Sequence, residues 1–407
     1  MRILLVSNDY PFGRRLRIGG GGSHVFYLAM GLVQSGADVS LITYDGASKE
    51  HSPLDHFQNF SLLPYIDRRG IDRTVTERAL EACRLKTPDV IHGHHFDGGK
   101  LGLTLAAAFN RPMVLTMHKP PKSSGDAYSA SDPNYMRRYD YALWHQLGTD
   151  QRIRAHIAYS KVYEQENRDI GVPDTRIEPI SHGVPVSFLC DKARAASRSA
   201  RLSLPSKAHI VLCPLRPEKP GIRTFIDAAV LLRKRYTNDR FYFIVTGDPR
   251  RGPIEACAAA TRHVSEARRL GLSDSVMVFR AYWLRQMWSI ISGSSVCVLP
   301  SEREGLSITA LEAMALSTPL VASEVVGLNE VIVDGITGLL ATQGKPEEFA
   351  DRIARILFDV ELRRRLVEQA KARVEECFSS ARMVDRHIEV YRKVIAQWRI
   401  LQKCQPG

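Results

Sequence analysis

The sequence contains no apolar run close to the roughly 18 to 20 residues that a bilayer-crossing helix needs. Its first residues, MRILLVSNDYP, enter a strand-like segment and lack the basic, apolar and small-residue regions of a secretion signal. The seven cysteines are scattered and include no CxxC pair, which argues against a disulfide framework or a zinc-cysteine cluster. We therefore expect a cytoplasmic protein with reduced thiols, whose only membrane contact would be peripheral, at the inner face.

Signals of nucleic-acid binding are also missing. Aromatic residues make up 8% of the chain and do not alternate with basic residues, and we find no RNP, helix-turn-helix or zinc-finger pattern. The formal net charge of +12 still favours association with anions. A nucleotide diphosphate and an anionic lipid surface fit this charge equally well, and a solvated basic face with no dedicated partner is the alternative.

With 407 residues, the chain is too long for one ordinary hydrophobic core, so we expect two domains. Residues 2–7 predict a buried strand, residues 23–35 an amphipathic helix and residues 38–44 a second strand, which together form a βαβ unit. Strand-like runs recur in the first half at residues 90–92, 113–118 and 155–159. The first half therefore predicts a parallel sheet with helices on both faces.

Small and polar residues fill positions 190–206 and predict an interdomain linker. The alternation of strands and helices then starts again. Further strands are predicted at residues 209–212, 241–246, 276–279, 296–299 and 320–322, with helices at 224–236 and 308–315. The charged tail from residue 346 to 398 predicts two long helices.

The most informative segment is SEREGLSITALEAMALSTPLVASEVVGLNEVIVDGITGLL, residues 301–340. It places Glu304 on a loop directly after a strand and Glu312 inside the helix that follows. A helix N-terminus offers unpaired backbone N–H groups and partial positive charge, so the turn from Gly305 through Leu306 and Ser307 to Ile308 can hold a diphosphate.

This segment resembles the donor-binding signature of retaining GT-B glycosyltransferases of family 4, in which two glutamates are separated by seven residues. The resemblance implies that Glu312 accepts hydrogen bonds from the ribose hydroxyls and that Glu304 faces the transferred sugar. It covers nearly the whole chain, from the first strand to Gly338.

A basic loop, Leu215 to Gly221, follows the first strand of the second half and resembles the family's arginine-and-lysine loop. Lys219 lies where the family's lysine would grip the diphosphate, which implies charge neutralisation without a divalent metal. Pro214 occupies the position of the family's arginine, and we expect Arg216 to substitute for it. Near residues 279–282, where such enzymes recognise the base, Arg280 and Tyr282 are further donor-binding candidates.

The first half contributes a glycine loop, Gly19 to Gly22, at the mouth of a helix. Residues 8–18 separate this loop from the first strand, which is too long an insertion for the GxGxxG turn of dinucleotide-binding proteins. In the family that the chain resembles, a glycine pair at this point approaches the donor phosphate, so Gly19 and Gly20 are candidates for donor binding. A merely flexible loop is the alternative.

Histidines cluster in the first half, in VIHGHHFDGG and in VLTMHK. The family places a histidine in contact with the donor sugar at the position of His118. We assign His24, His94 and His95 to acceptor binding, although strand-end histidines bonded within the fold are an equal alternative for the last two. No carboxylate or cysteine set at ligand spacing completes a metal cluster, so we expect neither a metal site nor a cofactor.

Together these features predict an α/β protein of the GT-B fold, with two Rossmann-like doubly wound parallel-sheet domains facing each other across a cleft. We expect an N-terminal acceptor-binding domain at residues 1–190, a C-terminal nucleotide-sugar-binding domain at residues 207–379, and a last helix, residues 380–407, packing back on the first domain. The resemblance implies a retaining, metal-independent hexosyltransferase with Glu304, His118 and Lys219 as its catalytic residues.

The donor is expected to be a UDP-sugar that supplies a hexosyl or N-acetylhexosaminyl group. The sequence does not identify the acceptor, because the loops that would bind it, residues 9–18 and 119–140, diverge freely. A lipid carrier, a glycan and a natural-product aglycone all remain open, as does the oligomeric state. Three alternatives for the activity remain: a nucleotide-sugar epimerase of the same fold, a Rossmann NAD(P)-dependent oxidoreductase, and a catalytically inactive binding module.

Overall fold

The computed structural model describes residues 1–7, 20–43, 53–63, 77, 80–81, 87–118, 141–197, 208–215, 221–246, 262–272, 275–279 and 284–404. The chain divides into two compact units. The N-terminal unit comprises Met1–Gly183 together with Ser380–Gly407, and the C-terminal unit comprises Val184–Ser379.

The N-terminal unit contains a seven-stranded sheet in the order β3-β2-β1-β4-β5-β6-β7, in which all neighbouring strands are parallel. Its strands are β1 (Arg2–Ser7), β2 (Asp38–Thr43), β3 (Phe60–Leu62), β4 (Val90–His94), β5 (Met113–Thr116), β6 (Ile153–Ala158) and β7 (Ile177–Pro179). The central strands are buried along almost their whole length, as expected for a parallel sheet covered by helices on both faces.

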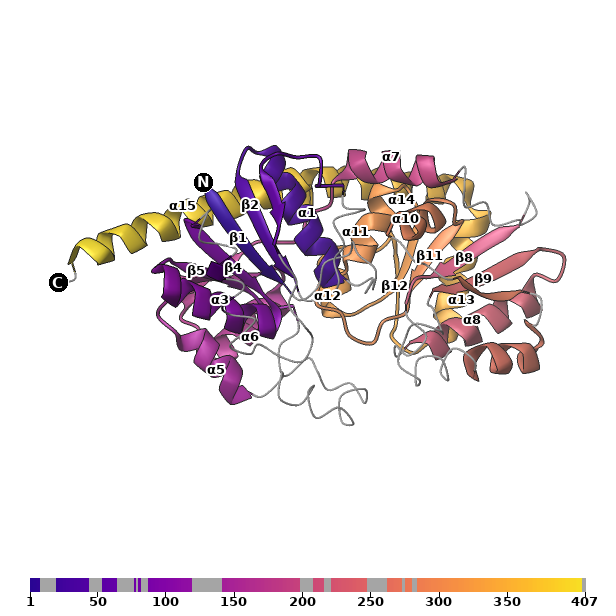
Figure 1. Ribbon diagram of the computed structural model, residues 1–407. Coiled ribbons are helices and arrows are strands. Elements are labelled where there is room, and N and C mark those ends of the chain that lie inside the picture. Colours follow the sequence, from indigo (N-terminus) through magenta and orange to yellow (C-terminus); the bar gives the residue numbers. More distant parts are fainter. Residues whose placement is uncertain are drawn as a thin grey trace. The chain divides into compact units, whose positions relative to one another are not determined.

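Helices cover both faces of this sheet. They are α1 (Gly20–Gln34), α3 (His95–Phe109), α5 (Tyr141–Thr149), α6 (Lys161–Asp169), the short η3 (Asp174–Arg176) and the C-terminal α15 (Ser380–Cys404). Helices α1 and α15 pack together on one side, and α3, α5 and α6 lie on the other (Figure 1). A Cβ atom on Gly31 of α1 would lie 2.4 Å from Cγ2 of Val384 in α15, so a glycine is needed where these two helices touch.

The C-terminal unit contains a six-stranded parallel sheet in the order β10-β9-β8-β11-β12-β13. Its strands are β8 (His209–Cys213), β9 (Phe241–Thr246), β10 (Val276–Phe279), β11 (Val296–Leu299), β12 (Leu320–Ser323) and β13 (Leu339–Ala341). Its helices are α7 (Val186–Ser197), α8 (Ile222–Arg235), η4 (Arg268–Leu272), α10 (Leu284–Ser292), α11 (Ile308–Ala315), α12 (Val326–Asn329), α13 (Pro346–Phe358) and α14 (Val360–Cys377). The side chains of α8 and α13 complete one apolar core with the strands, in which Phe225, Phe243 and Phe349 are fully buried.

Both sheets have the same topological switch point. The chain runs outward from β1 through β2 to β3 and then returns to the other side of β1 with β4; in the second sheet β11 returns in the same way beside β8. In open parallel sheets, ligands bind outside the carboxyl ends of the strands at such a reversal. The loops that follow β1, β4, β8 and β11 are therefore the ones on which to look for a site.

Two predictions about helices were wrong. The tail contains three helices, not two, because Asp359 leaves the helical conformation and its side chain caps α14 by accepting a hydrogen bond from the N–H of Leu362. The predicted linker at residues 190–206 also begins inside a helix, since α7 continues to Ser197. Leu189 and Ala193 of α7 are buried, and Phe188 contacts the indole ring of Trp288 in α10.

Among the described residues, no helix has the length and apolar character that crossing a bilayer requires. Helix α15 is long enough, with 25 residues, but charged residues recur along its sequence. It buries one apolar stripe, Met383, Val384, His387, Val390, Tyr391 and Val394, at helical spacing.

Candidate active site

Glu304 lies in the loop between β11 and α11, at the carboxyl end of the C-terminal sheet. Its side chain is half-buried, and the hydroxyl of Ser301 donates a hydrogen bond to Oε2 over 3.3 Å. Ser301 comes two residues after the end of β11, so the strand holds this partner at a defined position. The carboxylate is therefore oriented by the loop and remains accessible.

The turn from Gly305 to Ile308 leads directly into α11. Ser307 is the N-cap residue of this helix, with φ −82° and ψ 105°, and its hydroxyl accepts a hydrogen bond from the N–H of Ala310. The first-turn amides of a helix have no partner within the helix and carry its positive dipole end. This turn is thus suited to hold an anion.

Glu312 is buried one turn further along α11, with 5% of its surface exposed. The indole Nε1 of Trp288, which belongs to the neighbouring helix α10, donates a hydrogen bond to its Oε1 over 3.2 Å. Burying a carboxylate is costly unless it is hydrogen-bonded, so this contact fixes the side chain and offsets part of the desolvation penalty. In β11, burial raises the pKa of the Cys297 thiol, and the nearby Cys213 and Glu312 raise it further.

Two glycines allow the loops at this edge of the sheet to approach closely. A Cβ atom on Gly327, in the first turn of α12, would lie 2.2 Å from the carbonyl oxygen of Glu304 and 2.6 Å from that of Gly305. Gly221 has a φ of +99°, and a Cβ atom there would lie 1.8 Å from the carbonyl oxygen of Pro300. The starts of α12 and α8 are therefore packed against the backbone of the turn after β11, which holds this turn in place.

Several predicted site residues lie outside the described residues: Gly19, Arg216, Lys219, Arg280 and Tyr282. The loops expected to bind the acceptor, residues 9–18 and 119–140, do so as well. Gly20 is described and forms the exposed first residue of α1. Leu215 and Gly221, which flank the basic loop, lie at the carboxyl end of β8, beside β11.

In the N-terminal unit, the predicted histidines converge at the switch point between β1 and β4. His24 comes from the second turn of α1, His94 ends β4, and His118 follows β5. All three are buried, and the ring centroid of His24 lies 5.6 Å from that of His94 and 5.0 Å from that of His118. Nδ1 of His94 and Nε2 of His118 are 3.2 Å apart, at hydrogen-bond distance.

Burial dominates the electrostatics of this cluster. It lowers the pKa of His24, His94 and His118 well below the ordinary value of 6.5, and the neighbouring imidazoles lower it further. The rings are therefore neutral over the physiological pH range. His95 is half-buried and takes a left-handed conformation with a φ of 61°, which is uncommon for a residue other than glycine and marks the tight junction of β4 and α3.

The position of His118 is held by two tyrosines. Tyr159 and Tyr163 both donate hydrogen bonds from their hydroxyls to the backbone carbonyl of His118, over 3.2 and 2.7 Å. Beside it, His92 is bonded through Nε2 to the hydroxyl of Thr116 over 2.7 Å and through Nδ1 to that of Tyr391 in α15 over 2.6 Å. The C-terminal helix therefore contributes directly to the packing of this site.

The sequence did not identify four residues that shape these sites. Trp288 lies 24 residues before Glu312, and nothing local connects the two. Gly327 belongs to the segment 301–340, but its close approach to Glu304 is not evident from the sequence. His182 and His387 complete the histidine cluster, with ring centroids 4.4 and 6.1 Å from that of His24. His387 occupies a position in the apolar stripe of α15, where the sequence pattern alone indicates an ordinary core residue.

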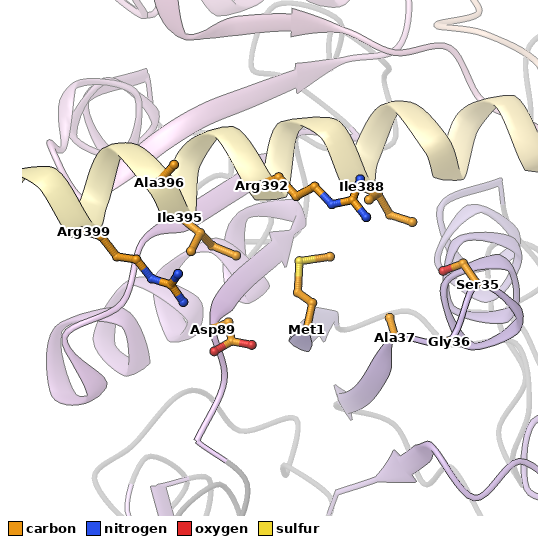
Figure 2. Close-up of a pocket in the computed structure, with 10 residues that line it drawn as sticks. All are labelled: Met1, Ser35, Gly36, Ala37, Asp89, Ile388, Arg392, Ile395, Ala396 and Arg399. Atoms are coloured by element: carbon orange, nitrogen blue, oxygen red, sulfur yellow. The ribbon is translucent and has the colours of Figure 1, made fainter.

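A groove of about 440 Å³ runs along α15 in the N-terminal unit (Figure 2). It is lined by Arg392 and Arg399 of α15 and by Met1 and Asp89, which precede β1 and β4. It therefore lies at the amino ends of the strands, whereas the histidine cluster lies at their carboxyl ends. Because ligands bind at the carboxyl ends in such sheets, we do not assign the groove to the active site.

Comparison with known proteins adds to this geometry. Residues 18–188 match the sequence profile described as "Glycosyltransferase Family 4", and residues 199–373 match the one described as "Glycosyl transferases group 1". A D-inositol 3-phosphate glycosyltransferase of Paenarthrobacter aurescens is 26% identical over 393 residues, which cover 93% of this chain and 94% of that protein.

Solved structures are similar over nearly the whole chain. Sucrose-phosphate synthase from Thermosynechococcus elongatus superimposes with a TM-score of 0.74 and 24% identity, covering 97% of this chain and 99% of the other. HepE of Anabaena, in complex with UDP and glucose, gives a TM-score of 0.75 with 15% identity and covers 97% of this chain and 100% of the other. At these identities, the structural likeness shows the fold, and it confirms the prediction of a GT-B protein built from two parallel α/β sheets.

Proposed function

This chain belongs to the family-4 glycosyltransferases, and on that premise we propose that it transfers a hexosyl or N-acetylhexosaminyl group from a UDP-sugar, with retention of configuration and without a metal requirement. Because it belongs to this family, the chain is a glycosyltransferase that uses a nucleotide-sugar donor, and not an oxidoreductase. One observation carries the proposal: Glu312, one turn beyond the N-cap of α11, is buried and accepts a hydrogen bond from Trp288.

The nucleotide is proposed to bind at the carboxyl edge of β8 and β11. The first-turn amides of α11 would hold the diphosphate, which suits both their donor geometry and the positive end of the helix dipole. Glu312 would accept hydrogen bonds from the two ribose hydroxyls, because a carboxylate has acceptor positions for both. Trp288 supports this role by fixing one carboxylate oxygen, so that binding does not have to order the side chain.

Charge neutralisation on the leaving diphosphate would come from Lys219, with Arg216 in the place of the family's arginine. A cation fixed beside two phosphates does the electrostatic work that a divalent metal does elsewhere. The positions of Leu215 and Gly221, beside the loop that carries Glu304, support this arrangement. We propose that Arg280 and Tyr282 contribute to base recognition.

Glu304 and His118 are proposed to orient the transferred sugar. Catalysis would follow a front-face displacement in which the donor phosphate accepts the acceptor's proton, so no side chain serves as nucleophile. Orientation and stabilisation of developing charge are then the enzyme's main contributions. The hydrogen bond from Ser301 to Glu304 and those from Tyr159 and Tyr163 to His118 support the required rigidity.

The acceptor would bind to the N-terminal unit, near His24, His94 and His95 and the glycines that open α1. Lipid carriers, glycans and natural-product aglycones fit the basic chain equally well. D-inositol 3-phosphate should be included in any acceptor screen, because the relative from Paenarthrobacter aurescens is named for it.

The test is a nucleotide-sugar screen of the whole chain, in metal-free buffer with a chelator. Thermal shifts against UDP, GDP, ADP and dTDP and their sugars identify the donor, since a ligand at 100 times its Kd stabilises the native state by about 2.7 kcal/mol. Turnover is then followed as release of free nucleotide with each acceptor, and the anomeric configuration of the product is read by NMR.

We expect UDP and a UDP-sugar to give the largest shift, and nucleotide release to depend on an acceptor and to persist with the chelator. An epimerase would convert the donor sugar without acceptor-linked product. An inactive binding module would bind the donor but release no nucleotide. Either result, or an inverted anomeric centre, would contradict the proposal.

A further inference from the structure

Three buried imidazoles in the N-terminal unit are close enough to bind a single ion. His24, His94 and His118 each offer one ring nitrogen, and these atoms all lie within 4.8 Å of one another. The pair formed by Nδ1 of His94 and Nε2 of His118 is 3.2 Å apart. Two nitrogens that share a tetrahedral zinc ion at the usual bond length are separated by about 3.3 Å. This pair is therefore already at ligand spacing.

We propose that His24, His94 and His118 form a binding site for one divalent transition-metal ion of the zinc class. The donor set consists of imidazoles, which suit zinc, copper, nickel and cobalt and not the oxygen-seeking magnesium or calcium. Three histidines with an open fourth position are also a known zinc coordination set. The amino ends of α1 and α3 lie nearby and favour an anion as the fourth ligand.

The unpartnered nitrogens of the cluster point to a ligand. Among the described residues, neither ring nitrogen of His24 has a hydrogen-bond partner, and neither does Nε2 of His94. His24 is 1% exposed, so water does not satisfy these atoms by simple exposure. Each buried polar group that lacks a partner destabilises the folded chain. Coordination would give one nitrogen of His24 a partner and would replace the contact between His94 and His118 with two bonds to the ion.

Further side chains surround the three ligands as an outer layer. The ring of His92 lies 4.1 Å from that of His94, centroid to centroid, and is fixed at both nitrogens by Thr116 and Tyr391. His182 lies 4.4 Å from His24, and its Nδ1 has no partner among the described residues. Outer residues of this kind orient metal ligands and support their affinity. His182 is placed to support His24 or to approach the fourth position.

Rigid elements supply all three ligands. His24 belongs to α1, His94 is the last residue of β4, and the backbone carbonyl of His118 is held by two tyrosine hydroxyls. Binding would therefore need only side-chain rotation to bring the third nitrogen to bonding distance. Sites built on strands and helices hold their geometry better than sites built on loops.

An ion at this site would regulate turnover and not assist it. This consequence rests on the proposed function, in which the ring of His118 orients the donor sugar. Coordination would occupy Nε2 of His118 and fix its ring on the ion, so that this nitrogen could not contact the donor sugar, and zinc should inhibit the reaction. The binding proposal itself stands or falls by measurements that do not involve activity.

The first test titrates the metal-stripped whole chain with Co²⁺ and follows the visible absorbance, because tetrahedral cobalt absorbs strongly. Zn²⁺ is then added to compete for the site. We expect one ion per chain. His24→Gln and His94→Gln should each bind at least about tenfold more weakly, since even outer-layer changes cost 10- to 100-fold in affinity. His156→Gln is the matched control, because His156 is a buried histidine of β6 in the same sheet and should leave binding unchanged.

Equal affinity in the wild type and the two ligand variants would overturn the proposal, as would the absence of one-to-one binding. If a variant does not fold, crystals of the wild-type chain soaked in zinc decide the question by anomalous scattering at the zinc edge. A peak between the rings of His24, His94 and His118 is expected; a peak elsewhere, or none, would overturn the assignment. Zinc that binds to the wild-type chain but does not inhibit turnover would instead count against the proposed role of His118.

Discussion

The indole Nε1 of Trp288 donates a hydrogen bond to Oε1 of Glu312 over 3.2 Å, and both side chains are buried. The two residues lie on neighbouring helices, α10 and α11, that pack beside the switch point of the C-terminal sheet. The carboxylate proposed to bind the ribose is thus positioned by a residue that the glutamate signature does not include.

Trp288→Phe should weaken UDP binding by about tenfold while leaving the fold intact. Phenylalanine keeps most of the ring packing but removes the N–H, and a hydrogen bond to a charged group is worth about 1.5 to 3 kcal/mol. Isothermal titration with UDP measures the change. Trp144→Phe is the control, because Trp144 is also buried but its Nε1 has no partner among the described residues. Equal losses in both variants would show a general packing effect.

Gly327→Ala should lower kcat by at least about tenfold, since a misplacement near 1 Å can cost up to a hundredfold. The added Cβ would lie 2.2 Å from the carbonyl oxygen of Glu304, so the loop that carries the glutamate must move. Steady-state kinetics measures kcat, and circular dichroism checks that the variant is folded. Gly344→Ala serves as comparison, because a Cβ atom there meets nothing within 4 Å, so any effect of this change comes from its φ of +73° and not from a clash. An unchanged kcat in Gly327→Ala would contradict the positioning role.

The elements of the fold could be predicted because their signals are local. Strands such as β9 and β11 are short apolar runs bounded by turns, and their predicted limits, residues 241–246 and 296–299, match the structure. The three-residue strands β3, β7 and β13 were not predicted, because so short a segment carries no periodicity. The extent of α7 was missed because its small polar residues resemble a linker, while buried contacts decide its conformation.

The arrangement of the candidate site, as distinct from the identity of some of its residues, was predictable only where one segment carries it. Glu304, Glu312 and the turn between them follow from a single strand, loop and helix. The histidine cluster instead draws on α1, β4, the loop after β5 and α15, and its assembly depends on strand order and on the return of the last helix. No spacing in the sequence reports that His24 and His387 share one site.

Protonation of His156 should make the N-terminal unit sensitive to acid. Burial and, to a lesser degree, the charge of Arg176 lower the pKa of this imidazole from 6.5 to about 3. Above pH 6.5 both folded and unfolded chains carry it neutral. As the pH falls from 6.5 toward 3, the unfolded chain binds a proton at this residue and the folded chain does not. The free energy of unfolding therefore falls by about 1.4 kcal/mol per pH unit.

Denaturant unfolding at pH 7 and pH 4 measures this effect in the wild type and in His156→Gln. On acidification, the free energy of unfolding of the variant should fall by about 3 kcal/mol less than that of the wild type, because glutamine does not titrate. His56→Gln, at an exposed histidine, should behave as the wild type does. Identical pH dependence in the wild type and His156→Gln would contradict the assignment.

Glu304→Gln should lower kcat by at least about a hundredfold while UDP still binds with nearly the wild-type Kd, because this residue is proposed to act on the sugar and not on the nucleotide. Glu302→Gln, two residues away and exposed, provides the matched control and should retain activity. The comparison needs kcat and the UDP Kd for both variants. A Glu304→Gln enzyme of normal rate, or one that has lost UDP binding, would remove this glutamate from its proposed role.

The central claim is that the edge of β8 and β11 binds a nucleotide diphosphate through the start of α11 and Glu312. It is tested most directly by calorimetric titration of UDP into the wild-type chain and Glu312→Gln, without metal. We predict one UDP per chain and a Kd at least about tenfold higher in the variant, which loses charge-assisted hydrogen bonds to the ribose. No binding by the wild type, or the same Kd in both proteins, would contradict the account.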